Sequence, residues 1–168
     1  MQIFKRKIVA LCTFTLLICF ANCGCTIKRE FTVADNTIAS KQFLAQQQVL
    51  SQLAKYEDAM RRMAYNEIAE LFTIDGEILH NSGAPIQGRE AIRLFMGSFS
   101  NYTMLENVTQ AESTEIVGNS ARQVGHYSQL VRTPANETVQ VMGHFEARWA
   151  RLRNGDWRIV QMHTLTDS

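Results

Sequence analysis

Four histidines are the side chains best suited to proton transfer or metal binding, because imidazole changes its charge near neutral pH. His80 ends a short segment, Glu77 to His80, that follows a turn at residues 73–76 and a long amphipathic segment. This order places one face of a short strand against a helix and so indicates a pocket beside His80. There the imidazole either contacts a ligand or reactant, or is simply hydrogen-bonded at the mouth of the pocket.

Two further histidines lie in a predicted hairpin. A turn centred on Ala135 pairs residues whose numbers sum to 270, which sets His126 directly opposite His144. Zinc requires three or four ligands, and no nearby cysteine or obvious acid completes the set, so we predict no metal site. We expect the two histidines to contact a ligand. Arg148 either binds an anionic group of that ligand or pairs with an acid at the surface.

Hydrophobic spacing predicts the elements that hold these residues. Helical periodicity begins near Ser40, and a stripe of apolar residues recurs at steps of 4, 3, 4 and 3: Val49, Leu53, Tyr56, Met60 and Met63. A short helical piece ends at Leu71-Phe72, and a further helix opens at Gly88. The remaining segments are rich in Val, Thr, Tyr and Phe and are predicted strands: 104–117, 120–132, 138–152 and 157–166. Helices followed by antiparallel strands predict an α+β domain with a curved sheet wrapped over the helices.

The hairpin register also pairs glycines with aromatic residues. Gly125 faces Phe145 and Gly143 faces Tyr127, so each ring covers the bare backbone of a glycine. The same register opposes two arginines, which is unfavourable, so a slip of one or two residues stays open. One hairpin face is more apolar than a solvent-facing sheet should be: Tyr127, Phe145, Ala147 and Trp149. We predict that this face pairs with the same face of a second chain in a homodimer. In the alternative parity, in which this face of the hairpin points to the interior, the aromatics line the pocket and the histidines lie outside.

Residues 1–25 are predicted to be a secretory or lipoprotein leader. Lys5, Arg6 and Lys7 precede an uncharged apolar run from Ile8 to Ala21, which is shorter than the roughly 20 residues of a membrane-spanning helix. The protein is therefore expected to be exported, either periplasmic or anchored to the envelope. Cys25 is a candidate lipid anchor, and simple cleavage of the leader is the alternative. Residues 26–39 are a predicted polar tether and 40–168 the folded domain.

Composition limits both the source of stability and the kinds of partner that the folded domain can bind. All 4 cysteines lie in the leader, so the stability of the folded part depends on packing and not on disulfides. The formal charge of +1 becomes −2 once the three cations of the leader are set aside, since the leader holds no acid. No basic stripe remains to attract a phosphate backbone, and nucleic acid is not a predicted partner. The glycine at the predicted third helix does not form a phosphate loop, and we predict no cofactor.

Three motifs carry a family resemblance: Leu-Phe-x-x-Asp at 71–75, Gly-x-Pro-Ile-x-Gly-Arg-Glu-Ala-Ile at 83–92 and Gly-Asp-Trp-Arg-Ile-Val at 155–160. In this order they resemble the SnoaL-like and ketosteroid-isomerase-like superfamily, which shares its fold with nuclear transport factor 2. The similarity covers roughly residues 43–166. It implies a cone-shaped, cystatin-like fold, a deep apolar pocket between the first helix and the sheet, and frequent dimerisation through the outer face of the sheet. Such motifs specify the fold far better than the activity.

The resemblance also implies roles for single residues. Ketosteroid isomerases carry a tyrosine that donates a hydrogen bond to the substrate oxygen, and its position here is Tyr56. Their general-base aspartate ends the short strand, where this chain has His80. Histidine, with a reference pKa of about 6.5, is a chemically sensible base. Their protonated aspartate falls at Arg148, or at Ala147 if a turn carries one extra residue. Neither residue is an acid, so steroid isomerisation is not expected.

We therefore expect an exported protein that binds a small, largely apolar molecule in its pocket without catalysis. The residues predicted to contact that molecule come from the helices and strands around the pocket: Met60, Phe95, His126, His144, Arg148 and Met162. The alternative is an isomerase, dehydratase or cyclase, in which His80 moves a proton and Tyr56 stabilises a developing oxyanion.

Overall fold

The computed structural model describes residues 33–167, with side chains from residue 37 onward. The predicted leader, Cys25 and the first part of the predicted tether lie outside the described residues. From Val33 onward the chain forms one compact unit. Among the helices of this unit, none is both long enough and apolar enough to cross a membrane.

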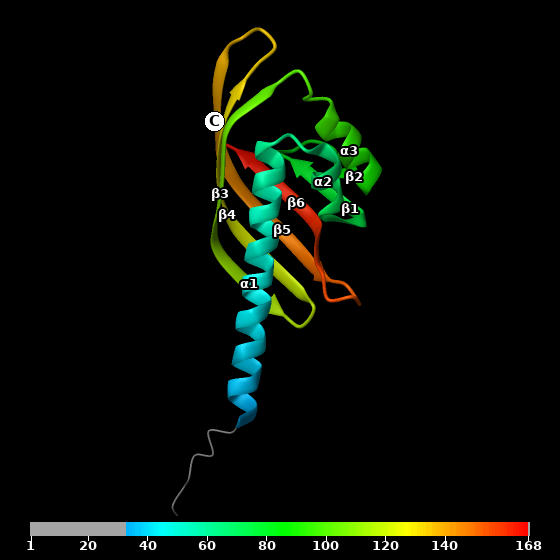
Figure 1. Ribbon diagram of the computed structural model, residues 1–168, viewed down its shortest axis with the longest axis vertical. Coiled ribbons are helices and arrows are strands. Elements are labelled where there is room, and N and C mark those ends of the chain that lie inside the picture. Colours follow the sequence, from blue (N-terminus) through cyan, green and yellow to red (C-terminus); the bar gives the residue numbers. More distant parts are fainter. Residues whose placement is uncertain (1–32, 168) are drawn as a thin grey trace, which may run out of the picture. The chain divides into compact units, whose positions relative to one another are not determined.

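The first helix, α1, spans Val33–Arg61 and so begins earlier than Ser40, where helical periodicity started in the sequence. No proline or glycine interrupts residues 33–39, so nothing in the chain stops the helix there. The predicted stripe is confirmed, since Val49, Leu53 and Met60 are buried. Beyond the helix Met63 adopts a positive φ of 54°, a left-handed conformation that an α-helix cannot continue through. Figure 1 shows the N-terminal end of α1 extending past the sheet.

A second helix, α2 (Tyr65–Glu70), leads directly into strand β1 (Phe72–His80). The turn predicted at residues 73–76 lies inside this strand, as an irregularity of pairing between Phe72 and Glu77. Gly76 sits at that irregularity, and a Cβ there would lie only 3.0 Å from the carbonyl oxygen of Ile159. The Asp-Gly pair thus marks a bulge that lets two backbones approach, and β1 is longer than the sequence predicted.

Strand β2 (Ile86–Gln87) pairs with β1 and is followed by helix α3 (Arg89–Gly97). Gly88 precedes this helix with φ of 90°, a conformation that favours glycine. The Arg89 guanidinium donates to the carbonyl oxygen of Phe72 at 2.7 Å and pairs with Glu70 at 3.0 Å. These contacts fix the start of α3 against the α2–β1 junction.

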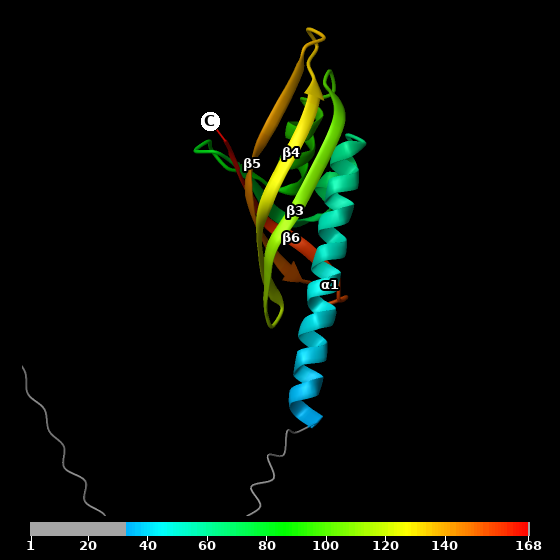
Figure 2. The same cartoon turned by 90° about the vertical axis from the view of Figure 1, so that its left-hand side faces the viewer.

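Four long strands complete the fold: β3 (Thr103–Val117), β4 (Ser120–Arg132), β5 (Thr138–Arg151) and β6 (Trp157–Thr166). The sheet order is β2-β1-β6-β5-β4-β3. Every neighbouring pair is antiparallel except β1 and β6, which run parallel, so the sheet is mixed and not purely antiparallel as predicted. The α+β class is confirmed, and Figures 1 and 2 show the helices gathered on one face of the curved sheet.

The predicted hairpin register is confirmed without a slip. Gly125 pairs with Phe145, Tyr127 with Gly143, and His126 with His144. A Cβ at Gly125 would lie 2.8 Å from the ring of Phe145, and one at Gly143 would lie 2.9 Å from the hydroxyl of Tyr127. The rings therefore cover the opposing glycines, as the pairing rule requires.

The hairpin aromatics face the helices, so the alternative parity is the correct one. Tyr127, Phe145, Ala147 and Trp149 are buried within a single chain, and most of them belong to its hydrophobic core. The prediction that this face forms a homodimer interface is therefore wrong. Large rings are needed to fill the space between α1 and a strongly curved sheet, and the polar residues at the alternate positions then face outward.

Candidate functional site

A cavity of about 350 Å³ lies between the helices and the concave face of the sheet. Its wall is formed by helices α1 and α3, by strands β1 and β3 to β6, and by residues of the loops that follow α1, α3 and β4. Five of the protein's 7 methionines line it: Met60, Met63, Met96, Met104 and Met162. Six aromatic residues add flat apolar surface: Tyr56, Phe95, Phe99, Tyr102, Tyr127 and Phe145.

The polar part of the cavity wall is small and carries no formal charge. It contains one histidine, one amide and three threonines beside the tyrosine hydroxyls: His80, Thr109, Gln129, Thr133 and Thr164. Among the described residues that line the cavity, none is an aspartate, glutamate, lysine or arginine. Burying a charged ligand without a partner of opposite charge is costly, so this wall suits an uncharged molecule.

The structure brings five of the predicted site residues together in this cavity. Tyr56 and Met60 reach it from α1, His80 from the end of β1, Phe95 from α3 and Met162 from β6. These residues come from four elements that are distant in the sequence. Helix periodicity and the alternation of strand residues place each of them on the inner side.

Tyr56 presents a hydrogen-bond donor to the cavity. Its ring packs edge-on against Phe72, with ring centroids 6.4 Å apart. Burial raises the pKa of Tyr56 to about 12, and the nearby Tyr127 hydroxyl adds to the effect. The phenol therefore keeps its proton at neutral pH. No hydrogen bond joins the Tyr56 hydroxyl to another described residue, which leaves it free to donate to a ligand.

The hydrogen bonds around His80 assign its tautomer. The backbone N–H of Thr166 donates to Oδ1 of Asn81 at 2.8 Å, so the amide Nδ2 of Asn81 is the atom that faces Nε2 of His80, at 3.2 Å. Because Nδ2 can only donate, Nε2 is the unprotonated nitrogen. The Nδ1–H of His80 then donates to Thr164 Oγ1 at 2.9 Å, and that hydroxyl donates to the carbonyl oxygen of Leu79 at 3.4 Å. Both ring nitrogens of His80 are thus engaged in hydrogen bonds.

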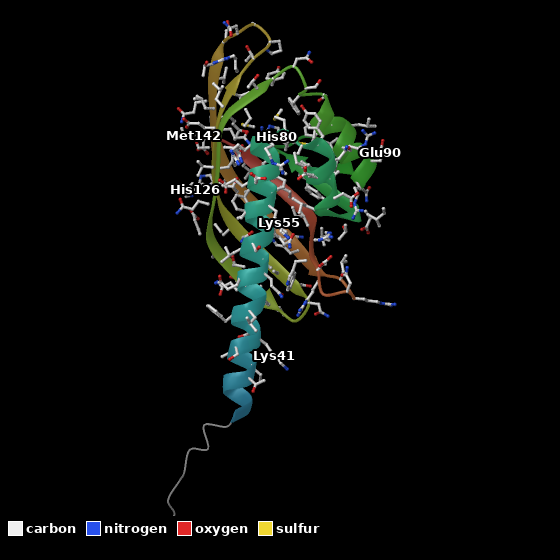
Figure 3. The ribbon with its side chains drawn as sticks, viewed as in Figure 1. Lys41, Lys55, His80, Glu90, His126 and Met142 are labelled. Atoms are coloured by element: carbon white, nitrogen blue, oxygen red, sulfur yellow. The ribbon has the colours of Figure 1, made fainter. Side chains whose placement is uncertain are left out.

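Three other residues predicted to contact a ligand do not line this cavity. The side chains of His126, His144 and Arg148 are 45%, 64% and 61% exposed and do not line the cavity. They lie on the outer face of the sheet. Figure 3 shows the contrast: His126 is on the side away from α1, whereas His80 is on the side of α1. The cause is the parity of the hairpin, because a shift of one residue exchanges the two faces of a strand.

Carboxylates are the partners of these outer residues. His126 lies 3.2 Å from Glu112, and His144 lies 3.7 Å from Asp167. Between the opposed arginines, Glu146 accepts from Arg122 at 2.7 Å and from Arg148 at 3.1 Å. The Arg122 guanidinium, followed by that of Arg148, holds the pKa of Glu146 below its ordinary value. This shared carboxylate removes the repulsion that the register alone would create.

The resemblance to ketosteroid isomerases offered two positions for the protonated aspartate, Arg148 and Ala147, and the structure places them on opposite faces of β5. Ala147 is fully buried on the inner face, whereas Arg148 points outward. The inward position of this strand therefore offers a methyl group where ketosteroid isomerases are expected to have a protonated carboxyl. In the part of the chain that the structure describes, no group of three or more His, Cys, Asp or Glu side chains is arranged to hold a metal.

Gln129 was not identified from the sequence, although it lines the cavity from β4. It lies two residues after Tyr127 and therefore on the same face of the strand. Once the aromatic face is assigned to the interior, this alternation places Gln129 in the wall. The sequence interpretation assigned that face to a dimer interface and so passed over the amide.

Comparison with known proteins places this geometry in a wider group. Residues 42–163 match a family model described as SnoaL-like domain. A ketosteroid isomerase-like protein from Erwinia carotovora atroseptica SCRI1043 is 12% identical, covers 73% of this chain and 96% of its own, and superposes with a TM-score of 0.67. An NTF2-like protein with a cystatin-like fold from Novosphingobium aromaticivorans is 15% identical over 81% of this chain and 90% of its own, with a TM-score of 0.63.

A third structure is described as a complex. It is a protein from Catenulispora acidiphila in complex with S-DNPA, 16% identical over 75% of this chain and 96% of its own, with a TM-score of 0.64. No curated protein matches the chain. At these identities the solved structures show the fold alone, which is the NTF2-like, cystatin-like fold expected from the sequence motifs.

Proposed function

The chain belongs to the SnoaL-like domain family, and we propose that it binds a small, uncharged, largely apolar molecule in its cavity without catalysing a reaction. The observation that carries this proposal is the character of the wall: a space of about 350 Å³ lined by methionines and aromatic rings, with no charged side chain among its described residues. Methionine side chains are flexible and polarisable and so adapt to irregular apolar ligands. The protein from Catenulispora acidiphila, which has the same fold, was solved in complex with S-DNPA, which supports the idea that this architecture accommodates a small molecule.

Two features favour binding over catalysis. A general base needs a free lone pair aimed at the substrate, whereas Nε2 of His80 already accepts a hydrogen bond from Asn81. Ala147 supplies no acid where a second oxyanion donor is expected. Tyr56 provides a donor, which orients a ligand but does not move a proton.

A matched pair of variants tests the binding proposal. Val141 lines the cavity, whereas Val108 is exposed on β3 and does not. We expect the bicyclic hydrocarbon indane to bind wild-type protein and to bind far more strongly than the anionic indane-2-carboxylate, measured by calorimetry or by NMR titration. Val141→Phe should weaken the binding of indane by at least about tenfold, because the larger side chain fills the space. Val108→Phe should not change it.

Two results would overturn the proposal. One is the absence of any bound molecule in native mass spectrometry of the purified protein together with no binding of either probe. The other is equal affinity for the hydrocarbon and the anion, since an uncharged wall offers the carboxylate no partner.

The second candidate is an isomerase, dehydratase or cyclase, and one observation favours it: Tyr56 and His80 line the same cavity. In such an enzyme, His80→Ala should lower the rate by about 10²–10⁴, and Tyr56→Phe by on the order of 10²–10³. We expect no turnover of enones, hydroxy-ketones or small cyclic lactones by wild-type protein. Turnover that depends on His80 would establish the enzyme instead.

Export completes the proposal. The predicted leader supports a mature protein that begins at Gly24, Cys25 or Thr26 and resides in the periplasm or on the envelope. Intact-mass analysis of protein from its native host measures the N-terminus. A diacylglyceryl adduct on Cys25 would identify a lipid anchor, and full-length chain in the cytosol would contradict export.

A further inference from the structure

A chain of two amides connects the cavity wall to the backbone of α1. Asn107 on β3 is buried, and its Nδ2 donates to the carbonyl oxygen of Glu57 at 3.2 Å. The Nε2 of Gln129 on β4 donates to Oδ1 of Asn107 at 2.9 Å. Asn107 and Gln129 are directly opposite each other in the β3–β4 pairing. The two side chains therefore form a short relay that starts at a main-chain atom.

The direction of this relay is fixed by its first member. A backbone carbonyl only accepts hydrogen bonds, so Asn107 must turn its amide nitrogen toward Glu57 and its oxygen toward Gln129. That oxygen likewise only accepts, so Gln129 must present Nε2 to Asn107. Reversing the Gln129 amide would bring two oxygens together. The Oε1 atom of Gln129 is thus the part of the amide left for the cavity.

Gln129 belongs to the cavity wall, whereas Asn107 does not. Among the described residues, none donates a hydrogen bond to Oε1 of Gln129. The cavity therefore contains a fixed acceptor on β4 in addition to the donor on Tyr56, and the rest of its wall is mostly apolar. An amide oxygen facing an apolar ligand without a partner is unfavourable, so a ligand that supplies an N–H or O–H gains affinity.

We propose that Gln129 is a specificity-determining residue, which accepts a hydrogen bond from a donor group of the ligand and is held in that orientation by Asn107. The ligand class follows: an uncharged apolar molecule that carries a hydroxyl group. The O–H of this group donates a hydrogen bond to Oε1 of Gln129, and its oxygen accepts one from Tyr56. This inference rests on the proposed binding function and adds the polar group that the ligand must bear.

Two probes with the same ring system and the same oxygen, one with and one without an O–H, test the role of the ligand's donor group. Indan-5-ol carries a phenolic O–H, and 5-methoxyindane has the same oxygen without the proton. Tyr56 can donate to the oxygen of either probe, so the probes differ in the proton offered to Gln129 and in one methyl group, and the Gln129→Met variant separates these two contributions. In calorimetric titration of the wild-type protein, we expect indan-5-ol to bind about tenfold more tightly, which is the effect of one neutral hydrogen bond.

Variants of Gln129 and Asn107 then test whether these two amides cause the preference for indan-5-ol. Gln129→Met keeps the length of the side chain but removes the acceptor, and should reduce the preference to less than about twofold. Gln140 is exposed on β5 outside the cavity, and Gln140→Met should retain the full preference. Asn107→Leu releases the Gln129 amide, which can then rotate and offer Nε2 to the ether oxygen. The preference should therefore shrink although Gln129 is still present.

The outcomes separate this inference from the binding proposal. If both probes bind wild-type protein equally, or if the preference survives in Gln129→Met, the assigned role of Gln129 is overturned while the cavity remains a binding site. If neither probe binds and native mass spectrometry also finds no bound molecule, the binding proposal itself fails. Should Asn107→Leu not fold, Gln129→Met and its Gln140→Met control still decide the result.

Discussion

The polar residues of the cavity owe their chemical state to neighbours that lie far away in the sequence. The tautomer of His80 is set by the side-chain amide of Asn81, which a backbone N–H of β6 orients. Gln129 is oriented through Asn107 by a carbonyl of α1. Motif spacing correctly placed Tyr56 and His80 near one pocket, since periodicity carries that information. It could not supply the hydrogen-bond directions, because these depend on contacts between elements.

The tautomer of His80 is the first prediction at this scale. Long-range ¹H–¹⁵N spectra at pH 8 should show a neutral ring protonated on Nδ1, because Asn81 donates to Nε2. Asn81→Gly removes that donor and suits the positive φ of 51° at this position, so it should raise the fraction of the Nε2–H form. A wild-type ring protonated on Nε2 would contradict the assignment.

Tyr56 provides a prediction on pH and stability. The folded-state pKa of about 12 lies above the ordinary value of 10.0, so the folded protein holds this proton more tightly than the unfolded chain does. The contribution is complete below pH 10 and is lost as the pH rises from 10 towards 12, by on the order of 1–3 kcal/mol. Urea unfolding should show a smaller loss over this range in Tyr56→Phe than in wild type. Tyr102→Phe, at the more exposed part of the wall, is the control and should behave like wild type.

At the scale of elements, side-chain alternation gave the hairpin register but not which face is buried. A turn centred on Ala135 and glycines opposite aromatic rings favoured the pairing of β4 with β5 that the structure confirms, although the opposed arginines had left a slip of one or two residues open. The aromatic face of the hairpin could pack either against the core of its own chain or against a second chain. Only the three-dimensional structure decides which face is buried. The bulge in β1 was missed for a different reason, since Asp75-Gly76 has the composition of a turn.

Gly143 should be among the least replaceable residues of the sheet. A Cβ at this position would lie 2.0 Å from the carbonyl oxygen of Leu165 on β6, so Gly143→Ala forces the strands apart. We expect the free energy of unfolding to fall by about 1–3 kcal/mol or more, measured by urea denaturation. Gly97→Ala in α3 is a matched control, because its Cβ would meet nothing closer than 4.0 Å. That variant should be unchanged or more stable by up to about 1 kcal/mol. Equal effects of the two substitutions would contradict the role of close strand contact.

At the scale of the whole molecule, the buried aromatics leave the outer face of the sheet as the surface for a second copy. Exposed apolar residues on this face sit among its charged pairs: Val108, Met142 and Leu165, which are 51%, 49% and 48% exposed. A homodimer remains our prediction, now through this face, because a two-fold axis can bring the same apolar patch of each chain together.

Light scattering at micromolar concentration tests the dimer. Met142→Glu should give folded monomers, since it introduces a charge at the centre of the patch. Leu94→Glu changes an exposed leucine of α3 and should leave the association unaffected. Trp149→Glu should give an unfolded or insoluble product, because Trp149 is 1% exposed in the core. A clean wild-type monomer would exclude the association.

The five thioethers of the cavity also make the site a chemical reporter of its own occupancy. Peroxide converts methionine to a polar sulfoxide at a rate that follows access to the sulfur. A bound apolar molecule should slow sulfoxide formation at Met60, Met63, Met96, Met104 and Met162, measured by peptide mass spectrometry. Met142, on the opposite side of the sheet, should oxidise at the same rate with and without ligand. Oxidation of the empty cavity would in turn make its wall polar, so oxidative damage and ligand binding should exclude each other.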